Sequence, residues 1–205
     1  GAYIVHFMIE APKQGLDIDP KNVYYNDINS LWVEFFKKLN KDFKLGIPES
    51  NITCQDARTL EYDMIFDIGL LNSPYKDPEQ STNVSAGGGK GNIYGPIAKV
   101  VWEKYINPET GIMAIVTPTT MYGSTKMGDV SPDLQKIDGL VDSLVRVKTD
   151  VEKDFARDGN AVGTVISYGI AMKNKSTNEL LVNGKSFSKT FDRFKFIPRY
   201  TDDIA

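Results

Sequence analysis

Cysteine and histidine are almost absent from this sequence, which has one of each among its 205 residues. Cys54 alone cannot form an internal disulfide, and Cys54 together with His6 cannot supply the usual four ligands of a structural zinc site. These absences exclude a disulfide-stabilised scaffold, a zinc finger and most histidine-based catalysis, and we expect no metal site.

The sequence also lacks an excess of positive charge, because 24 Lys and Arg stand against 27 Asp and Glu, giving a formal net charge of -3. Any contact with a phosphate backbone must therefore be local. No apolar run reaches the roughly 18 residues of a membrane-spanning helix, and no basic segment followed by an apolar one opens the chain. We expect a cytoplasmic protein that contacts no membrane.

The composition that remains is that of a folded protein, with 41% hydrophobic and 25% charged residues. The length corresponds to between one and two domains, and no shift in composition divides the chain. We therefore expect a single domain over residues 1–205. The chain begins at Gly1 rather than at a methionine, which indicates processing, a tag remnant or a fragment cut from a longer chain, and we expect a truncated N-terminus.

Short apolar runs alternate with amphipathic stretches, a pattern that predicts an α/β fold with a mainly parallel sheet and crossover helices on both faces. Residues 2–10 fit either a helix or a buried strand, and we favour the helix. The other expected helices cover residues 31–39, 93–105 and 134–144. The expected strands cover residues 23–25, 51–54, 64–71, 112–116, 144–148 and 161–172, and the residues after 185 fit neither type of element.

Polar side chains follow three of the expected strands, namely Asp27, Asp56 and Asn72. Ligands of parallel α/β sheets bind at the carboxyl ends of the strands. A carboxylate there can accept two hydrogen bonds from ribose hydroxyls, and a second one can accept from an adenine amino group. Asp27 as an Asx turn or helix N-cap, and Asp56 as an ordinary turn residue, remain open alternatives.

The tetrapeptide Asn72-Ser73-Pro74-Tyr75 follows a strongly apolar run. An amide oxygen and a backbone carbonyl can accept both hydrogens of an exocyclic amine, and an aromatic ring can stack on the base that carries it. The tetrapeptide therefore predicts a clamp for a planar amine. The alternative is a strand-ending turn with a buried tyrosine.

In its context MIFDIGLLNSPY, this tetrapeptide resembles the catalytic motif of the class I S-adenosylmethionine-dependent amino-methyltransferases, especially the DNA adenine methyltransferases of restriction-modification systems and phages. That motif has the form Asp/Asn/Ser-Pro-Pro-Tyr/Phe/Trp, so Ser73 replaces the usual first proline. The resemblance implies that Asn72 and the carbonyl of Ser73 bind the target amine, that Pro74 fixes the turn, and that Tyr75 stacks on the base.

The resemblance extends to both sides of the tetrapeptide. Tyr25-Asn26-Asp27-Ile28-Asn29 is similar to the second motif of the family, and Gln55-Asp56-Ala57 is similar to the third. Gly91-Asn92-Ile93-Tyr94 and the run from Gly111 to Pro118 look like the following helix and strand. The family then implies a Rossmann-like methyltransferase fold ending in an antiparallel C-terminal hairpin, for which the strands near residues 145 and 165 are suited.

The function implied by this resemblance is transfer of a methyl group from S-adenosylmethionine to the exocyclic amino group of a flipped adenine in DNA. The implied cofactor-binding residues are Gly1, as the last glycine of the first motif, and Asp27, Ile28, Asp56, Ala57 and Asn72. The implied substrate-binding residues are Tyr75, Lys90, Asn92 and Tyr94. Lys90 would touch a phosphate from a glycine-rich loop that closes over the base, or would belong to a solvated linker.

No separate target-recognition region is evident in the sequence, so we expect a separate target-recognition subunit or domain to be a partner. Two alternatives stay open. A similar clamp would serve a protein-glutamine or RNA-base methyltransferase. The serine at position 73 and the missing start of the first motif would also fit a catalytically silent subunit that keeps the fold to bind a partner.

Overall fold

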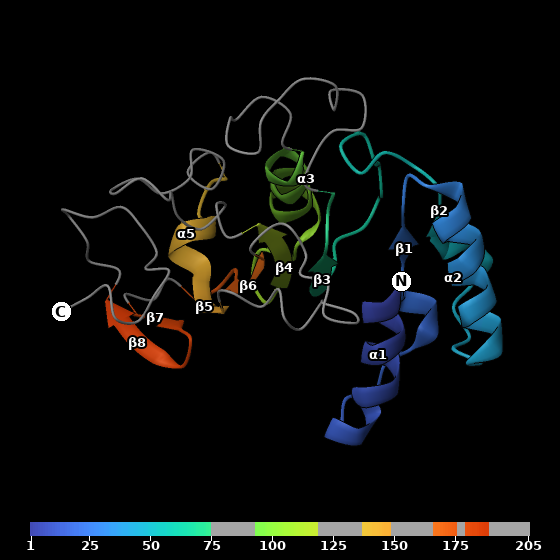
Figure 1. The fold of residues 1–205 in the computed structure, drawn as a ribbon, viewed down its shortest axis with the longest axis horizontal. Helices are drawn as coiled ribbons and strands as arrows, with labels where there is room; N and C mark the ends of the chain where they lie inside the picture. Colours follow the sequence, from blue (N-terminus) through green and yellow to red (C-terminus); the bar gives the residue numbers. More distant parts are fainter. Residues whose placement is uncertain (75–92, 119–136, 149–165, 176–178, 189–205) are drawn as a thin grey trace, which may run out of the picture. The chain divides into compact units, whose positions relative to one another are not determined.

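The computed structural model describes residues 1–74, 93–118, 137–148, 166–175 and 179–188 (Figure 1). The chain divides into two compact units, an N-terminal unit of Gly1–Glu61 and a C-terminal unit of Tyr62–Ala205. Each unit has its own hydrophobic core. Within the described ranges, no helix has both the length and the apolar character needed to cross a membrane.

The N-terminal unit packs helices against a small parallel pair of strands (Figure 1). Strands β1 (Tyr25–Asn26) and β2 (Ile52–Thr53) pair with Tyr25 opposite Ile52. Helix α2 (Ser30–Asp42) begins after Asn29, whose side chain accepts a hydrogen bond from the Leu31 amide at 2.9 Å. The remaining elements are α1 (Ala2–Glu10) and the 3-10 turns η1 (Pro12–Gln14), η2 (Pro20–Asn22) and η3 (Glu49–Asn51).

The core of the N-terminal unit is centred on Phe36, which is fully buried and stacks on Tyr25 with 4.0 Å between ring centroids. Gly1 lies directly against this ring, because a Cβ atom at Gly1 would stand 2.8 Å from Cδ2 of Phe36. Phe36 is fully buried and stacked on Tyr25, so it cannot yield easily. A glycine at the start of α1 is therefore a packing requirement of this core.

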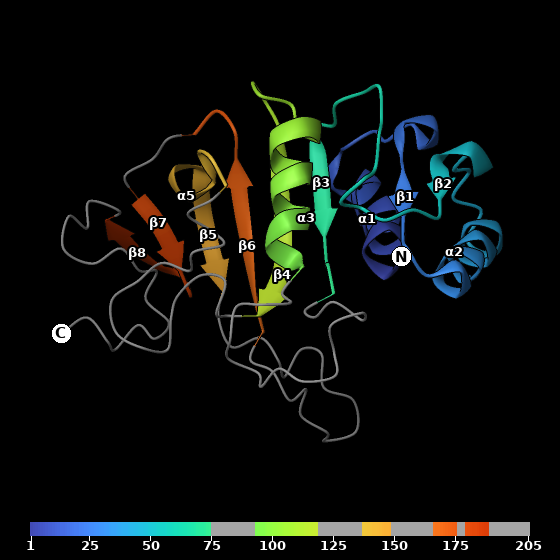
Figure 2. The same cartoon turned by 90° about the horizontal axis from the view of Figure 1, so that it is seen from above.

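The C-terminal unit is built on a six-stranded sheet in the order β3-β4-β6-β5-β7-β8 (Figure 2). The strands are β3 (Ile68–Leu71), β4 (Ile112–Pro118), β5 (Leu144–Lys148), β6 (Ile166–Met172), β7 (Glu179–Val182) and β8 (Lys185–Ser188). The β3/β4 and β5/β7 pairs are parallel, and the β4/β6, β5/β6 and β7/β8 pairs are antiparallel.

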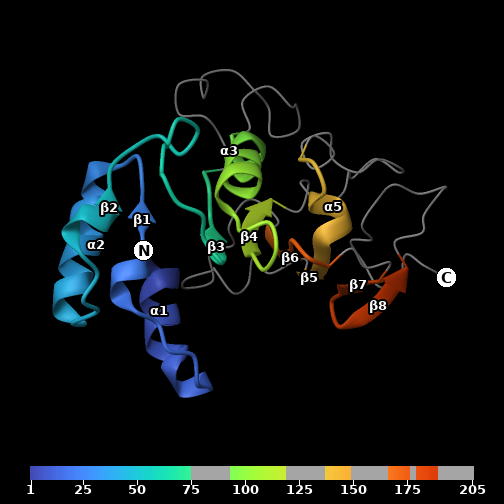
Figure 3. The same ribbon diagram turned by 180° about the vertical axis from the view of Figure 1, so that it is seen from behind.

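Helices α3 (Tyr94–Val100) and α5 (Leu140–Ser143) cover the same face of this sheet (Figures 1 and 3). A π-helical turn, η5 (Val101–Tyr105), continues α3 and carries Trp102 into the core. Gly69 of β3 leaves room for this layer, because a Cβ atom there would stand 2.7 Å from Cδ1 of Ile106. The hydrophobic core of this unit therefore packs β3 and β4 against α3, η5 and Ile106, which precede β4 in the chain.

The α/β class, the helix over residues 2–10 and the antiparallel pairing of the strands near residues 145 and 165 agree with the sequence-based expectations. The expectation of a mainly parallel sheet needs correction for the C-terminal unit, whose six described strands form a mixed sheet. The physical reason is that β6 inserts antiparallel between β4 and β5, and β8 returns along β7. The helix expected over residues 134–144 is described only from 140 to 143, and residues 134–136 lie outside the described ranges.

Candidate functional site at the strand ends

Asp27 directly follows β1 and is half-buried. Its Oδ1 accepts a hydrogen bond from the Asn29 amide at 2.9 Å, and its Oδ2 accepts one from the Tyr25 hydroxyl at 3.3 Å. Asp27 therefore forms an Asx turn, while the N-cap of α2 is Asn29. A carboxylate has about four acceptor positions, so these two contacts leave it able to accept further donors.

Tyr25 keeps its proton beside this carboxylate. Burial raises the pKa of the Tyr25 phenol, and the charge of Asp27 and the hydrogen bond to it raise that pKa further. The hydroxyl is therefore a donor at neutral pH and fixes one Asp27 oxygen. Burial lowers the pKa of the Gly1 amino group, and the charge of Asp27 opposes that shift.

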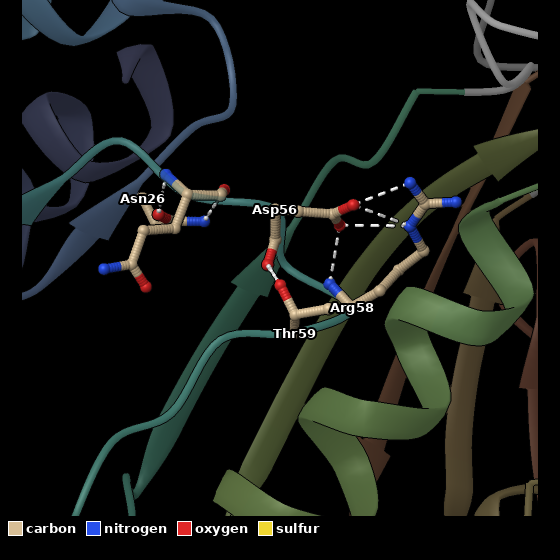
Figure 4. A network of polar contacts seen from close by, with 5 residues as sticks. Asn26, Asp56, Arg58 and Thr59 are labelled. Carbon is tan, nitrogen blue, oxygen red and sulfur yellow. Dashed lines mark hydrogen bonds and ion pairs between the residues drawn. The ribbon is translucent and has the colours of Figure 1, made fainter.

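Asp56 lies in the turn after β2 and binds the side chain of Arg58 (Figure 4). The Arg58 Nε donates to both carboxylate oxygens, at 3.0 and 2.9 Å, and Nη2 donates to Oδ2 at 2.6 Å. The Arg58 amide adds a bond to Oδ1 at 2.8 Å. These contacts lower the pKa of Asp56, with the side-chain hydrogen bond as the largest cause. They also occupy the acceptor positions of the carboxylate.

We predict that Arg58→Gln will raise the pKa of Asp56 toward the ordinary value of about 3.9, because the guanidinium that stabilises the charged form is removed. The ion pair stabilises the folded chain above the ordinary pKa, and this contribution is lost as the pH falls through the lowered pKa. The carboxyl carbon shift of Asp56, followed by NMR during an acid titration, measures the change. An unchanged titration midpoint would contradict the pairing.

The two strand ends are joined by the side chain of Asn26 (Figure 4). Its Nδ2 donates to the Gln55 carbonyl at 3.0 Å, and its Oδ1 accepts from the Gln55 amide at 3.1 Å and from the Thr53 hydroxyl at 2.9 Å. The Asp27 amide donates to the Thr53 carbonyl at 3.3 Å. The side chain of Asn26 thus extends the pairing of β1 and β2 beyond their backbone hydrogen bonds, as far as Gln55.

The residues next to the two carboxylates differ in exposure. Ile28 is 61% exposed, which is high for an aliphatic side chain, and Ala57 is half-buried. The Cys54 thiol donates to the Ile28 carbonyl at 3.6 Å, a further link between the two loops. The end of the β1/β2 pair therefore carries an apolar surface beside a carboxylate, an arrangement suited to a ligand with a planar face and hydroxyl groups.

In the C-terminal unit, Asn72 follows β3 directly and is exposed, as is Pro74. Ser73 between them is 5% exposed, and its hydroxyl has no hydrogen-bond partner in the described part of the chain. Thr117 near the end of the neighbouring strand β4 is fully buried, and its hydroxyl also lacks a partner there. The alternation of buried and exposed residues points the amide of Asn72 outward while the Ser73 side chain is turned inward.

The other expected site residues divide into two groups. Tyr94, at the start of α3, is 2% exposed and belongs to the core of the C-terminal unit. Tyr75, Lys90 and Asn92 lie outside the described residues. The described residues contain no group of three or more His, Cys, Asp or Glu side chains that could hold a metal ion.

Sequence reasoning did not assign a role to the side chains of Asn26, Thr53 and Arg58. Asn26 stands directly before Asp27, but its contacts depend on the register of β1 and β2. Arg58 stands two residues after Asp56 in a turn, and this spacing of a cation and a carboxylate could have predicted the ion pair.

No family model and no curated protein sequence matches this chain. Several solved structures share its fold, including the following two. The methyltransferase subunit of a type I restriction-modification system from Streptococcus thermophilus aligns with a TM-score of 0.55 and 16% identity, covering 94% of this chain and 43% of that one. The type IIG restriction endonuclease BpuSI aligns with a TM-score of 0.54 and 18% identity, covering 81% of this chain and 21% of that one. The chain therefore spans less than half the length of either protein.

Proposed function

We propose that this chain is an S-adenosylmethionine-dependent methyltransferase whose substrate is the exocyclic amino group of adenine in DNA. The observation that carries the proposal is the tetrapeptide beginning at Asn72, which follows strand β3 directly. The fold shared with a restriction-modification methyltransferase subunit and a type IIG restriction enzyme supports the same reaction class.

Asp27 is the residue best suited to the ribose of the cofactor. Its two oxygens are oriented by the Asn29 amide and the Tyr25 hydroxyl, and each keeps acceptor capacity for a ribose hydroxyl. The two donors offset part of the cost of half-burying this carboxylate. Gly1, packed against Phe36, would bring backbone close to the cofactor, and exposed Ile28 would contact the adenine face.

Asp56 and Ala57 would bind the adenine edge. The carboxylate of Asp56 fits the adenine amino group only where the Arg58 side chain gives up at least one of its bonds. That exchange costs little for a partly exposed ion pair, whose net worth is typically below about 1 kcal/mol. Arg58 thus holds the carboxylate charged and ordered until a competing donor arrives.

Asn72 and the carbonyl of Ser73 would accept the two hydrogens of the target amine, and Tyr75 would stack on the flipped base. Pro74 restricts the turn that carries both acceptors. Holding both hydrogens directs the nitrogen lone pair at the electrophile, so positioning rather than a strong base supplies most of the rate. Lys90 and Asn92 are proposed to contact the DNA and the flipped base, whereas the buried Tyr94 belongs to the core of the C-terminal unit.

When bound, S-adenosylmethionine would supply a methyl group on a sulfonium, from which a neutral thioether is a good leaving group. In the proposed step the amine nitrogen forms a bond to the methyl carbon while the carbon–sulfur bond breaks. S-adenosylhomocysteine leaves, and the amine releases one proton to solvent, so charge and atoms balance. No His or Cys nucleophile is needed for this displacement.

Recognition of a DNA sequence is assigned to a separate domain or subunit, because the chain spans less than half of the proteins whose fold it shares. A protein-glutamine or RNA-base substrate is the second candidate. The observation that favours the protein substrate is the net charge of -3, which gives no general attraction to a nucleic-acid backbone.

The proposal is tested by incubating the chain with methyl-labelled S-adenosylmethionine and DNA, then digesting the DNA to nucleosides. We expect label in N6-methyladenine with the unmodified chain, and none with Asn72→Ala. Parallel reactions with RNA and with protein separate the two candidates. Label in RNA or protein but not in DNA would overturn the assignment of DNA adenine as substrate.

A further inference from the structure

The contacts of Asn26 suggest a role that the catalytic motifs do not assign. Asn26 binds the carbonyl and the amide of Gln55 and accepts from Thr53, so one side chain joins the end of β1 to the turn after β2. Asp27 follows Asn26 in the sequence, and Asp56 follows Gln55.

We infer that Asn26 is a positioning residue, which sets the spacing between the ribose-binding carboxylate of Asp27 and the adenine-binding turn at Asp56 by locking Gln55 to the end of β1. This inference rests on the proposed function, since it concerns the nucleoside half of the same cofactor. The ligand class is an adenine nucleoside that spans both carboxylates.

This additional contact between the strand ends matters because β1 and β2 are short. β1 and β2 pair over only two residues each, so the backbone ladder that would hold the following turns in register is short. The Asp27 amide adds one long bond of 3.3 Å to the Thr53 carbonyl. Asn26 supplies both a donor and an acceptor to the Gln55 backbone and thereby extends the pairing to the turn that carries Asp56.

The geometry also explains why asparagine suits this position. The side chain must donate to a carbonyl and accept from an amide at the same time, which a carboxylate cannot do and an amide can. Aspartate at position 26 would face the Gln55 carbonyl with a second negative oxygen. The amide therefore meets both requirements without adding charge beside Asp27.

The chain offers a matched control in Asn40, which makes the same pair of bonds elsewhere in the N-terminal unit. Its Nδ2 donates to the Ile47 carbonyl at 2.7 Å, and its Oδ1 accepts from the Ile47 amide at 3.1 Å. Asn40 lies in the last turn of α2 and joins no strand end. Asn40→Ala removes an equivalent pair of hydrogen bonds and so measures how much the loss of such bonds alone affects ligand affinity.

The test compares S-adenosylhomocysteine with S-inosylhomocysteine, which lacks the adenine amino group, by calorimetry on the unmodified chain, Asn26→Ala and Asn40→Ala. We expect Asn26→Ala to lose about tenfold in affinity for the adenine ligand, the equivalent of about 1.4 kcal/mol. We expect it also to lose the preference for adenine over hypoxanthine. Asn40→Ala should keep both the affinity and the preference.

A double-mutant cycle with Asp56→Ala distinguishes positioning of Asp56 from a general structural role. The quantity compared is the loss of ligand affinity caused by Asn26→Ala with and without Asp56. If Asn26 acts by placing Asp56, then Asn26→Ala will cost less affinity in the Asp56→Ala background than in the unmodified chain. Additive losses, or an unchanged preference for adenine in Asn26→Ala, would overturn the inference while leaving the proposed function intact. If the unmodified chain bound neither ligand, the proposed function itself would fail, and the role of Asn26 in cofactor binding with it.

Discussion

Replacing Asp27 by asparagine is expected to weaken the binding of S-adenosylmethionine about 100-fold. Asparagine keeps an oxygen for the Asn29 amide, so the Asx turn that now forms at 2.9 Å can persist. It loses the charge and the second carboxylate oxygen, which are proposed to hold the two ribose hydroxyls. Two charge-assisted hydrogen bonds at about 1.5 kcal/mol each amount to this factor.

Asp19→Asn is the matched control for this prediction. Asp19 also accepts a hydrogen bond from a backbone amide two residues later, that of Lys21 at 2.9 Å, but it precedes β1 whereas Asp27 follows it. Calorimetric titration of both variants at the same ionic strength measures the difference. Equal affinities for the two variants would rule out Asp27 as the ribose-binding carboxylate.

Replacing Trp102 by alanine is expected to lower the free energy of unfolding of the C-terminal unit by about 3–5 kcal/mol. Trp102 is 1% exposed, and its Nε1 donates to the Asp138 carbonyl at 3.0 Å. The Lys173 ammonium lies 4.2 Å from the centre of its ring. The variant therefore leaves a large cavity, loses the hydrogen bond to Asp138 and leaves a cation without its aromatic partner.

The second tryptophan of the chain provides the control, because Trp32 is 57% exposed on α2. Trp32→Ala should change the free energy of unfolding by no more than about 0.5 kcal/mol. Chemical denaturation followed by circular dichroism compares both variants with the unmodified chain. A loss for Trp102→Ala no larger than that for Trp32→Ala would contradict the core described for the C-terminal unit.

The sequence predicted the bounds of two elements, although apolar periodicity alone left one of them, residues 2–10, open between a helix and a strand. The helix of residues 2–10 and the strand of residues 144–148 have the expected bounds. The strand expected over 64–71 is shorter, because only Ile68–Leu71 pairs with β4 and Phe66 forms an isolated bridge to Ile106. Hydrophobicity alone could not separate these paired residues from the extended segment before them.

Turn chemistry offered a signal that the prediction did not use. The hairpin of β7 and β8 turns at Asn183-Gly184, where both residues have positive φ, at 48° and 86°. Asn-Gly between two apolar or β-prone runs is a strong indication of such a turn. The antiparallel strands that make the sheet mixed were therefore partly readable from the sequence, whereas the insertion of β6 between β4 and β5 depends on contacts distant in the chain.

The sequence predicted which carboxylates follow the strands of the candidate site, but it did not predict the hydrogen bonds that these residues and their neighbours make. Asp27 and Asp56 each follow a strand, as expected from the pattern of apolar runs. The contacts of Asn26 required the register of β1 against β2, and those of Arg58 required the geometry of the turn after Asp56. Neither is encoded in local periodicity, because both depend on how the backbone is placed by pairing.

The most direct test of the proposed function is a calorimetric titration of S-adenosylmethionine into the unmodified chain, with inosine in place of the cofactor as a blank. We predict saturable binding of one cofactor molecule per chain. Absence of saturation up to roughly 1 mM, where the binding free energy is only about -4 kcal/mol, would contradict the methyltransferase proposal. That result would favour the silent subunit that keeps the fold to bind a partner.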